Sequence, residues 1–396
     1  ADQVLRCAVL KQLRELTYEE LEFWLADSHS LRSFARLEQS QFPSTSTLQT
    51  NIKALHEETW MAIHQFIVSY ADEEKLEQGR KIRLDSTVVE TDIHAPSDST
   101  LLWDGVRVIT RWLFDGKKFS PQPGYGFSDH RRVMKKRLLT IQNTKSKRIR
   151  ESAYRDMLHY AYRVCTYGKA AAEELYEHRG GSEPLDMFRA RNLAEKIARA
   201  VNLLNKVMDQ TQRRVLKNEK VPASEKVVSL FETHTDIIVK TNRKTEYGHK
   251  VFVVSGASNL IIDCLIERGN PADSDRFKTL LDRQVQYYGN VPRQTAADGG
   301  FASKNNVSYA KECEVKDVVF SKKRGLAVED MAKSRWVYRK LKKFRAGIEA
   351  NISTLKRSYG LSRCNWSGWE GFKQYVWSAI VSYNLLVLAR LKLARA

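Results

Sequence analysis

The sequence predicts an α/β fold: a mixed five-stranded sheet flanked by helices, with a helical N-terminal region and a large helical insertion after the first strand. Strand-like stretches rich in β-branched residues occur at residues 81–91 and again between residues 236 and 320, where they alternate with helical patterns. Such alternation is typical of a sheet covered by helices. Residues 97–233, between the first strand and the others, show only helical periodicity, so we expect them to form a separate insertion.

The N-terminal 78 residues are expected to form a helical domain. Thr17 and Glu20 have the spacing of a capping box, and apolar residues follow at helical spacing. A second helical pattern covers residues 30–37, and a third begins after Pro43 and continues to about residue 78. Short helices with tight turns permit a DNA-binding helix-turn-helix. A plain packing or dimerisation module fits this stretch equally well.

The sheet is expected to be built from two separate parts of the chain, residues 79–96 and 234–396. The first part contains the strand at residues 81–91, in which Asp85 lies on the face opposite Leu84. The second part supplies the other strands, including a hairpin whose turn covers residues 256–259, and the helices between them. The two parts should therefore form one core that the insertion interrupts.

The charge of the chain predicts a polyanionic partner. Lys and Arg number 66 against 47 Asp and Glu, which gives a formal net charge of +19, and nucleic acid is the commonest polyanion in cells. Nine cations lie between residues 131 and 150 with no acid between Asp129 and Glu151. Because these cations repel one another, a phosphate-facing surface is favoured over a merely solvated one. The DNA contacts expected here are Arg131, Arg132, Lys135, Lys136, Arg137, Lys147 and Arg148.

The cysteines and the most apolar segment favour a cytoplasmic protein. Five single cysteines, with no C-x-x-C pair, exclude a disulfide framework and a zinc ribbon and fit a reducing compartment. Residues 375–389 form the most apolar stretch, but serines and an asparagine interrupt it and it is shorter than the roughly 20 residues that a membrane span needs. We expect a buried helix there and no membrane partner.

Three acids stand where a simple surface salt bridge is a weak explanation. Asp85 lies within a strand, and Asp298 closes another strand before two glycines that let the backbone turn. Glu349 is the sole acid between Asp330 and Glu370, in a basic stretch that reads as a long helix from about residue 329 to 357. Strand ends and a flanking helix can bring three such groups together at one edge of a sheet. Glu329 and Asp330 are the alternative third acid if the helix register differs.

Three converging carboxylates repel one another unless a cation joins them. Mg²⁺ binds a few carboxylates together with water and substrate phosphate. A pair of such ions activates a nucleophile and stabilises the leaving oxygen of an in-line phosphoryl transfer. The acids and the charge excess together indicate metal-dependent chemistry on a nucleic acid.

The residues around these acids resemble those of the DDE transposases of bacterial insertion sequences, and more narrowly the group with a Y-R-E-K signature. Residues 345–356 fit R-x(3)-E-x(6)-K, with RLDSTVVETDI around Asp85 and TAADGGF around Asp298. The resemblance covers about residues 10–390 and implies a ribonuclease-H-like core.

Carried over to this chain, the resemblance implies that Asp85, Asp298 and Glu349 bind two Mg²⁺ ions, which Mn²⁺ can replace. It also implies further DNA contacts on the last long basic helix. Arg345 and Lys356 should contact DNA phosphates near the transposon end. The signature tyrosine falls at position 342, where this chain has Lys342, and Tyr338 one turn earlier is the candidate to replace it.

The function that the resemblance implies is Mg²⁺-dependent cleavage and strand transfer at the terminal inverted repeats of an insertion sequence. The partners would be double-stranded DNA of the transposon ends and target and a second copy of the chain, on the bacterial nucleoid. Two alternatives stay open: a ribonuclease-H-like metal nuclease or resolvase that cleaves without strand transfer, and a catalytically silent DNA-binding regulator derived from a transposase. The acid triad argues against the silent regulator.

Overall fold

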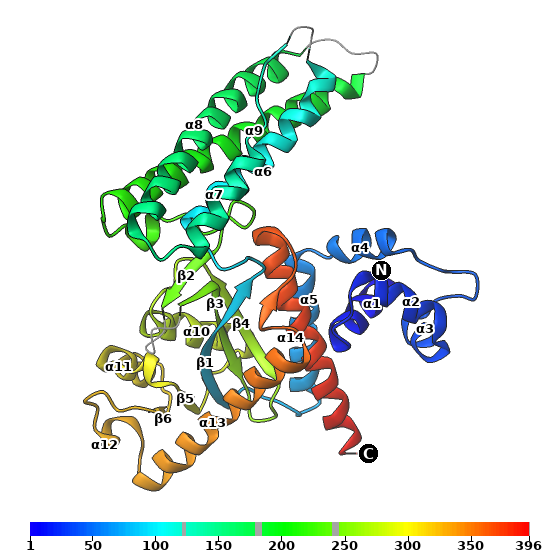
Figure 1. Ribbon diagram of the computed structural model, residues 1–396. Coiled ribbons are helices and arrows are strands. Elements are labelled where there is room, and N and C mark those ends of the chain that lie inside the picture. The colour runs from blue at the N-terminus through cyan, green and yellow to red at the C-terminus, as the bar shows by residue number, and fades with distance from the viewer. Residues whose placement is uncertain (121–123, 179–183, 240–244, 396) are drawn as a thin grey trace. The chain divides into compact units, whose positions relative to one another are not determined.

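The computed structural model describes residues 1–120, 124–178, 184–239 and 245–395 (Figure 1). Contacts divide the chain into two units. Unit 1 is Ala1–Asp92 together with Asp236–Ala396, and unit 2 is Ile93–Thr235. Unit 2 contains the segment expected to be an insertion, whereas the N-terminal helices belong to the same unit as the sheet.

Unit 1 is built on a mixed sheet with seven strands among its described residues. The strands are β1 (Lys81–Thr91), β2 (Asp236–Val239), β3 (Thr245–Ser255), β4 (Ile261–Glu267), β5 (Gln294–Ala297), β6 (Asp317–Phe320) and β7 (Arg363–Cys364). The five strands β4, β3, β1, β5 and β6 are neighbours in that order, while β2 adds to β3 and β7 adds to β1. The expected number of five strands is therefore wrong. A two-residue strand such as β7 has no periodicity for a sequence pattern to reveal.

The register of the sheet aligns the ends of its parallel strands. β1 is antiparallel to β3 and parallel to β5, with Leu84 opposite Ala297. β5 is parallel to β6, with Ala297 opposite Phe320. The residues that follow these three, Asp85, Asp298 and Ser321, therefore lie side by side along one edge of the sheet.

Helices of unit 1 pack on both faces of the sheet, and α10, α11, α12, α13 and α14 contact its strands. The helices of this unit are α1 (Asp2–Leu13), α2 (Tyr18–Asp27), α3 (His29–Ala35), α4 (Thr45–Lys53), α5 (Glu57–Glu73), α10 (Asp273–Tyr288), α11 (Lys304–Glu312), α12 (Val328–Met331), α13 (Arg335–Ser358) and α14 (Gly368–Leu393), with the 3₁₀ turn η4 (Gly299–Phe301). On β3, Val251 and Val253 join one apolar core and Phe252 and Val254 join the other. This period of two shows that the strand is buried on both faces.

The N-terminal helices share a core with the sheet. The capping box at Thr17 is present, since its side chain accepts from the backbone N–H of Glu20 and the Glu20 carboxylate accepts in return. The single helix expected from Pro43 to residue 78 is instead two helices, because α4 ends at Lys53 and α5 begins at Glu57. Two acids in the first turn of α5 suit a new helix N-terminus.

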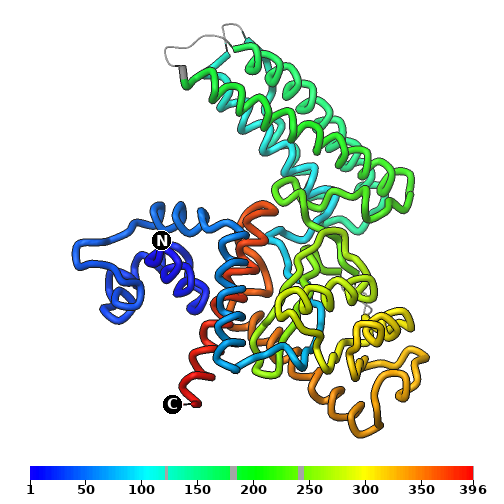
Figure 2. Tube along the Cα trace, turned by 180° about the vertical axis from the view of Figure 1, so that it is seen from behind, coloured from blue at the N-terminus to red at the C-terminus, as the bar shows by residue number. Residues whose placement is uncertain are grey.

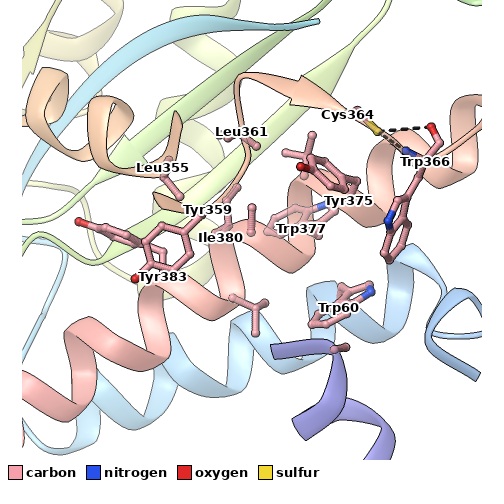
Figure 3. Close-up of a cluster of buried hydrophobic side chains, with 14 of the residues drawn as sticks. Trp60, Leu355, Tyr359, Leu361, Cys364, Trp366, Tyr375, Trp377, Ile380 and Tyr383 are labelled. Atoms are coloured by element: carbon pink, nitrogen blue, oxygen red, sulfur yellow. Dashed lines mark hydrogen bonds between the residues drawn. The ribbon is translucent and has the colours of Figure 1, made fainter. Parts of the chain in front are cut away.

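The core that joins these helices to the sheet is rich in aromatic side chains. Figure 3 shows Trp60 of α5 facing Trp377 and Ile380 of α14, with Leu355 of α13 nearby. The helix α14 is long and apolar enough to cross a membrane by length and composition, but half of its apolar window is buried in the protein. It packs as the core helix that residues 375–389 were expected to form.

Unit 2 is a helical bundle with its own apolar core. Its helices are α6 (Asp98–Gly116), α7 (Arg131–Asn143), α8 (Lys147–Glu177) and α9 (Pro184–Thr211), with the short turns η1 (Lys117–Phe119), η2 (Gln212–Leu216) and η3 (Ala223–Glu225). The four long helices run side by side in both views (Figures 1 and 2). Residues such as Leu102, Met157 and Leu204 are fully buried between them.

Candidate active site

Two of the three candidate acids are placed by the sheet itself. Asp85 continues β1 directly after Leu84, and Asp298 directly follows Ala297, the last residue of β5, which is aligned with Leu84. Adjacent parallel strands lie about 4.8 Å apart. Two side chains that are 213 positions apart in the sequence are thus brought to neighbouring strands.

Helix α13 supplies the third acid. Its first turn is capped by Ser334, whose side chain accepts from the backbone N–H of Val337. Its apolar residues, including Leu341 and Ile348, are buried against the sheet. This packing turns Arg345 inward at the margin of the buried face, and Glu349 follows one helical turn later.

The guanidinium of Arg345 contacts all three acids. Its Nη2 lies 2.6 Å from Oδ2 of Asp85 and 3.2 Å from Oδ1 of Asp298. Its Nη1 donates to Oε1 of Glu349. The structure therefore brings together the three carboxylates that the sequence singled out, around one cation.

Burial differs across this cluster. The side chains of Arg345 and Asp85 are 12% and 13% exposed, that of Asp298 is 37% exposed and that of Glu349 is 60% exposed. Burial raises the pKa of Asp85 to about 6, although Arg345 opposes the shift. Burial also opposes ionisation of Asp298, but hydrogen bonds from Ser321 and backbone N–H groups, with Arg345, hold its pKa below the ordinary value. The two aspartates thus have pKa values shifted in opposite directions.

The donor chemistry of the cluster suits a hard divalent cation. Three carboxylates, with no thiol or imidazole, are the oxygen ligands that Mg²⁺ prefers. In this structure, no three His, Cys, Asp or Glu side chains in the described part of the chain are close enough together to hold a metal ion. Arg345 explains this, because its guanidinium occupies the space between the carboxylates and neutralises part of their charge. The residues fit a divalent ion provided that Arg345 withdraws.

Ser321 supports Asp298 in a way that the sequence did not signal. Its hydroxyl donates to Oδ1 of Asp298 at 2.8 Å and accepts from the backbone N–H of Gly299 at 2.9 Å. Ser321 could be identified only from the alignment of β5 with β6, because that alignment places residue 321 beside residue 298. One hydroxyl thereby fixes both the carboxylate and the turn that follows it.

Asp273, a fourth acid beside the cluster, was also missed. Its Oδ1 accepts from Ser86 Oγ at 3.0 Å and from Lys250 Nζ at 3.1 Å. It also explains the glycines after Asp298. Gly299 and Gly300 do not need a left-handed backbone; a side chain at Gly300 would meet the Asp273 carboxylate, and one at Gly299 would meet the stem of Lys322. The glycines provide space rather than a sharp turn.

The expected DNA contacts on α13 fall into different environments. Lys342 is exposed. Tyr338 is buried, and its hydroxyl points to the carbonyl of Phe320 at 3.4 Å. Nζ of Lys356 donates to the carbonyl of Val88 at 2.9 Å. In this structure Tyr338 and Lys356 therefore support the sheet, and of the residues expected to contact DNA on this helix, Lys342 is exposed and Arg345 lies in the cluster.

The basic segment of unit 2 is less uniformly unpaired than the sequence indicated. Arg131, Arg137 and Lys147 are paired with Asp129, Asp156 and Glu151. The expectation of nine uncompensated cations is wrong for these three, because the acids lie just outside the run or one helix away. The other expected DNA contacts in this segment are exposed on α7 and the start of α8: Arg132, Lys135, Lys136 and Arg148.

The alternative third acids lie on a different element from Glu349. Glu329 is on α12 and pairs with Arg335 at 3.9 Å. The Asp330 carboxylate accepts from the backbone N–H of Ala327, as a helix cap. Glu349 is the acid that shares Arg345 with Asp85 and Asp298.

Comparison with protein families finds a match that begins at the end of unit 2 and covers most of the part of unit 1 that follows it. The family model of the transposase DDE domain matches residues 228–385, which include Asp298, Arg345 and Glu349. Asp85 precedes the matched segment, on the strand that pairs with β3 and β5 inside it. Comparisons with curated proteins and with solved structures gave no match. The mixed sheet is consistent with a ribonuclease-H-like transposase domain, and the family match over residues 228–385 supports a DDE transposase.

Proposed function

We propose that this protein is a DDE transposase that binds the terminal inverted repeats of a bacterial insertion sequence and cleaves and rejoins DNA through Asp85, Asp298 and Glu349. The observation that carries the proposal is the single guanidinium of Arg345 in contact with all three carboxylates. These acids come from two strands and a helix far apart in the chain. A purely structural cluster would not require their side chains to meet at the partly exposed edge of the sheet.

The reaction consists of two phosphoryl transfers. In the first, a water oxygen bonds to the phosphorus at the transposon end and the bond to the 3′-oxygen breaks, which frees a 3′-hydroxyl. In the second, that hydroxyl bonds to a target phosphorus and displaces the next 3′-oxygen. Two divalent ions, when bound, would activate the nucleophile and stabilise the leaving oxygen. The three carboxylates would hold the ions, and Ser321 would keep Asp298 oriented toward them.

Arg345 has a second role in this proposal. Its guanidinium contacts all three acids, so it would offset part of their negative charge when no divalent ion is bound. If a divalent ion displaced the guanidinium from the carboxylates, Arg345 would still lie one helical turn from Glu349 on α13. A planar guanidinium matches a phosphate with two parallel hydrogen bonds. We therefore assign Arg345 to the phosphate next to the bond that breaks.

Surfaces away from the triad would hold the rest of the DNA. The exposed cations of α7 and α8, Arg132, Lys135, Lys136 and Arg148, are proposed to contact phosphates. The N-terminal helices are proposed to recognise the terminal repeat or to form the dimer contact. A homodimer acting on the cytoplasmic nucleoid would bring two transposon ends together.

The test uses a supercoiled plasmid that carries the native gene with its flanking DNA. Asp85→Asn, Asp298→Asn and Glu349→Gln should each reduce Mg²⁺-dependent cleavage by more than the roughly 10–100-fold expected for loss of an outer partner of a metal ligand. Binding of the same DNA in EDTA should change little. Glu329→Gln and Asp330→Asn are the matched controls and should retain cleavage. Full cleavage by any triad variant would remove that residue from the site.

The products separate the proposal from its alternatives. Joining of the freed 3′ end to a second plasmid identifies strand transfer. Cleavage without joining would favour a metal nuclease or resolvase. Binding without cleavage, with Mg²⁺ or Mn²⁺, would favour a silent regulator.

A further inference from the structure

The first half of α13 presents an open groove that the triad does not use. Its lining is Trp336, Arg339, Lys340, Lys342, Lys343 and Ala346, around a volume of about 650 Å³. Trp336 is 65% exposed although the next two residues, Val337 and Tyr338, are buried. Large exposed aromatics on a polar surface are typical of a binding site.

The groove is strongly basic. Arg339, Lys340, Lys342 and Lys343 form no ion pair within the described part of the chain, in contrast to Arg335 at the start of the helix, which pairs with Glu329. Nζ of Lys340 lies 4.9 Å from the centre of the Trp336 ring. Four positive charges beside an accessible indole face are complementary to a chain of phosphates and bases.

The groove and the candidate active site lie on the same helix but on different faces of it. The face of α13 that lines the groove carries residues at intervals of three and four: Trp336, Arg339, Lys340 and Lys343. At about 100° per residue, Arg345 projects about 180° away from Trp336 around the helix axis, and Glu349 about 140° away. At 1.5 Å per residue, Trp336 lies about 20 Å along the axis from Glu349, which equals about six base pairs of B-DNA.

We propose that this groove binds a single strand of DNA, an inference that rests on the proposed function. Phosphates contact Arg339 and Lys343, and an unpaired base stacks on Trp336. A single strand is favoured over a duplex because the indole offers a stacking face, and bases inside a duplex have no free face to meet it. The groove thereby holds a separated strand on the face of α13 that the triad does not occupy.

The test measures DNA binding by fluorescence anisotropy with the full chain in EDTA, so that no cleavage occurs. The probes are a labelled 20-nucleotide oligo-dT and a blunt 20-base-pair duplex. Trp336→Ala should weaken oligo-dT binding about tenfold, the size expected for one stacked base, and duplex binding less than about twofold. Trp336→Phe should restore most of the loss. The control is Phe231→Ala, an exposed aromatic residue outside the surfaces proposed to bind DNA, which should leave both affinities unchanged.

The cations are tested through the salt dependence. Arg339→Gln and Lys343→Gln should each lower the slope of log K against log salt by about 0.7 for the single strand. Equal losses for both probes with Trp336→Ala, or an equal loss of oligo-dT binding with Phe231→Ala, would overturn the proposal. The plasmid cleavage assay is independent of this result. If the wild-type chain cleaves the plasmid but Trp336→Ala binds oligo-dT normally, only the proposed single-strand groove is wrong. If Trp336→Ala weakens oligo-dT binding but the wild-type chain never cleaves, the proposed cleavage activity is wrong.

Discussion

Arg345 contacts all three acids of the candidate site. It supplies one positive charge against three carboxylates, so the cluster remains net negative even with the guanidinium in place. Nε of Arg345 is also buried without a partner among the described residues. An arginine in this position is well held by its ion pairs but is not fully satisfied, which makes its displacement by a divalent ion reasonable.

Removal of the Arg345 charge should strengthen metal binding. In Arg345→Gln no cation competes for the three carboxylates and their mutual repulsion increases, so Mn²⁺ affinity should rise by about tenfold, or 1.4 kcal/mol. Mn²⁺ titration followed by electron paramagnetic resonance, without DNA, measures this change. Arg335→Gln, on the same helix, should bind Mn²⁺ like the wild type. Weaker binding by Arg345→Gln would show that Arg345 supports the metal site instead of competing with it.

Asp85 should make stability depend on pH. Its carboxyl has a pKa of about 6 in the folded chain against an ordinary 3.8, so the folded state holds the proton more tightly than the unfolded state. The free energy of unfolding should therefore fall as pH rises from about 4 to 6, by up to roughly 3 kcal/mol, and this contribution should then stay constant.

Urea unfolding of wild type and Asp85→Asn at a series of pH values measures the Asp85 contribution, because the other titrating groups are common to both proteins. The stability difference between the two should change across this pH range and be flat above it. A difference that is flat from pH 4 to 7 would mean that Asp85 titrates normally.

At the scale of elements, the turn after β5 is fitted tightly against the start of α10. A methyl group at Gly300 would meet the carboxylate of Asp273, which cannot move without losing its hydrogen bonds to Ser86 and Lys250. Gly300→Ala should lower the urea midpoint of unit 1 by an amount that corresponds to about 1–3 kcal/mol. Gly126→Ala, where nothing lies within 4 Å, should change stability by less than about 0.5 kcal/mol. Equal effects at the two positions would contradict this account.

The sequence was most informative about strands and helices that have a clear hydrophobic periodicity or a recognisable cap or turn. The strand at residues 81–91, the hairpin at residues 256–259 and the helix that holds Glu349 were all expected near their observed places. The order of these elements was enough to suggest that Asp85, Asp298 and Glu349 converge. The long basic helix was expected to begin near Glu329, yet α12 ends at Met331 and Ser334 caps a new helix. A hydroxyl cap depends on one residue and its nearest neighbours, so it is easily overlooked when helices are predicted from hydrophobic periodicity over many residues.

The contacts that complete the site were not predictable from the pattern. Ser321 reaches Asp298 only through the β5–β6 register, and Asp273 reaches Ser86 from the start of α10. Helical spacing alone grouped Tyr338 with Arg345, whereas packing buries Tyr338. Such contacts depend on strand register and helix rotation, which one sequence does not specify.

At the scale of the whole molecule, the N-terminal helices and the sheet should unfold together. Residues of α1, α2 and α5 share one apolar core with β3 and α14. A chain that lacks residues 1–56 would expose the face of α14 that these helices cover. We expect it to aggregate or to lose cooperative unfolding of unit 1, as measured by circular dichroism and size-exclusion chromatography. A monomeric truncated chain with wild-type thermal stability would show that the N-terminal region is an independent domain.

Unit 2, in contrast, should fold without unit 1. Its buried core residues lie between Leu101 and Val207, all within unit 2, and both ends of the segment Ile93–Thr235 connect to unit 1. A helical bundle with this many local contacts needs no partner for its apolar face.

Residues 93–235 expressed alone should show a cooperative thermal transition by circular dichroism and bind duplex DNA with a steep salt dependence. Replacing Arg132, Lys135, Lys136 and Arg148 with Gln should lower the slope of log K against log salt by about 0.9 for each phosphate that is no longer neutralised. A folded segment whose DNA binding is unaffected by the four changes would assign the basic run to solvation rather than to DNA.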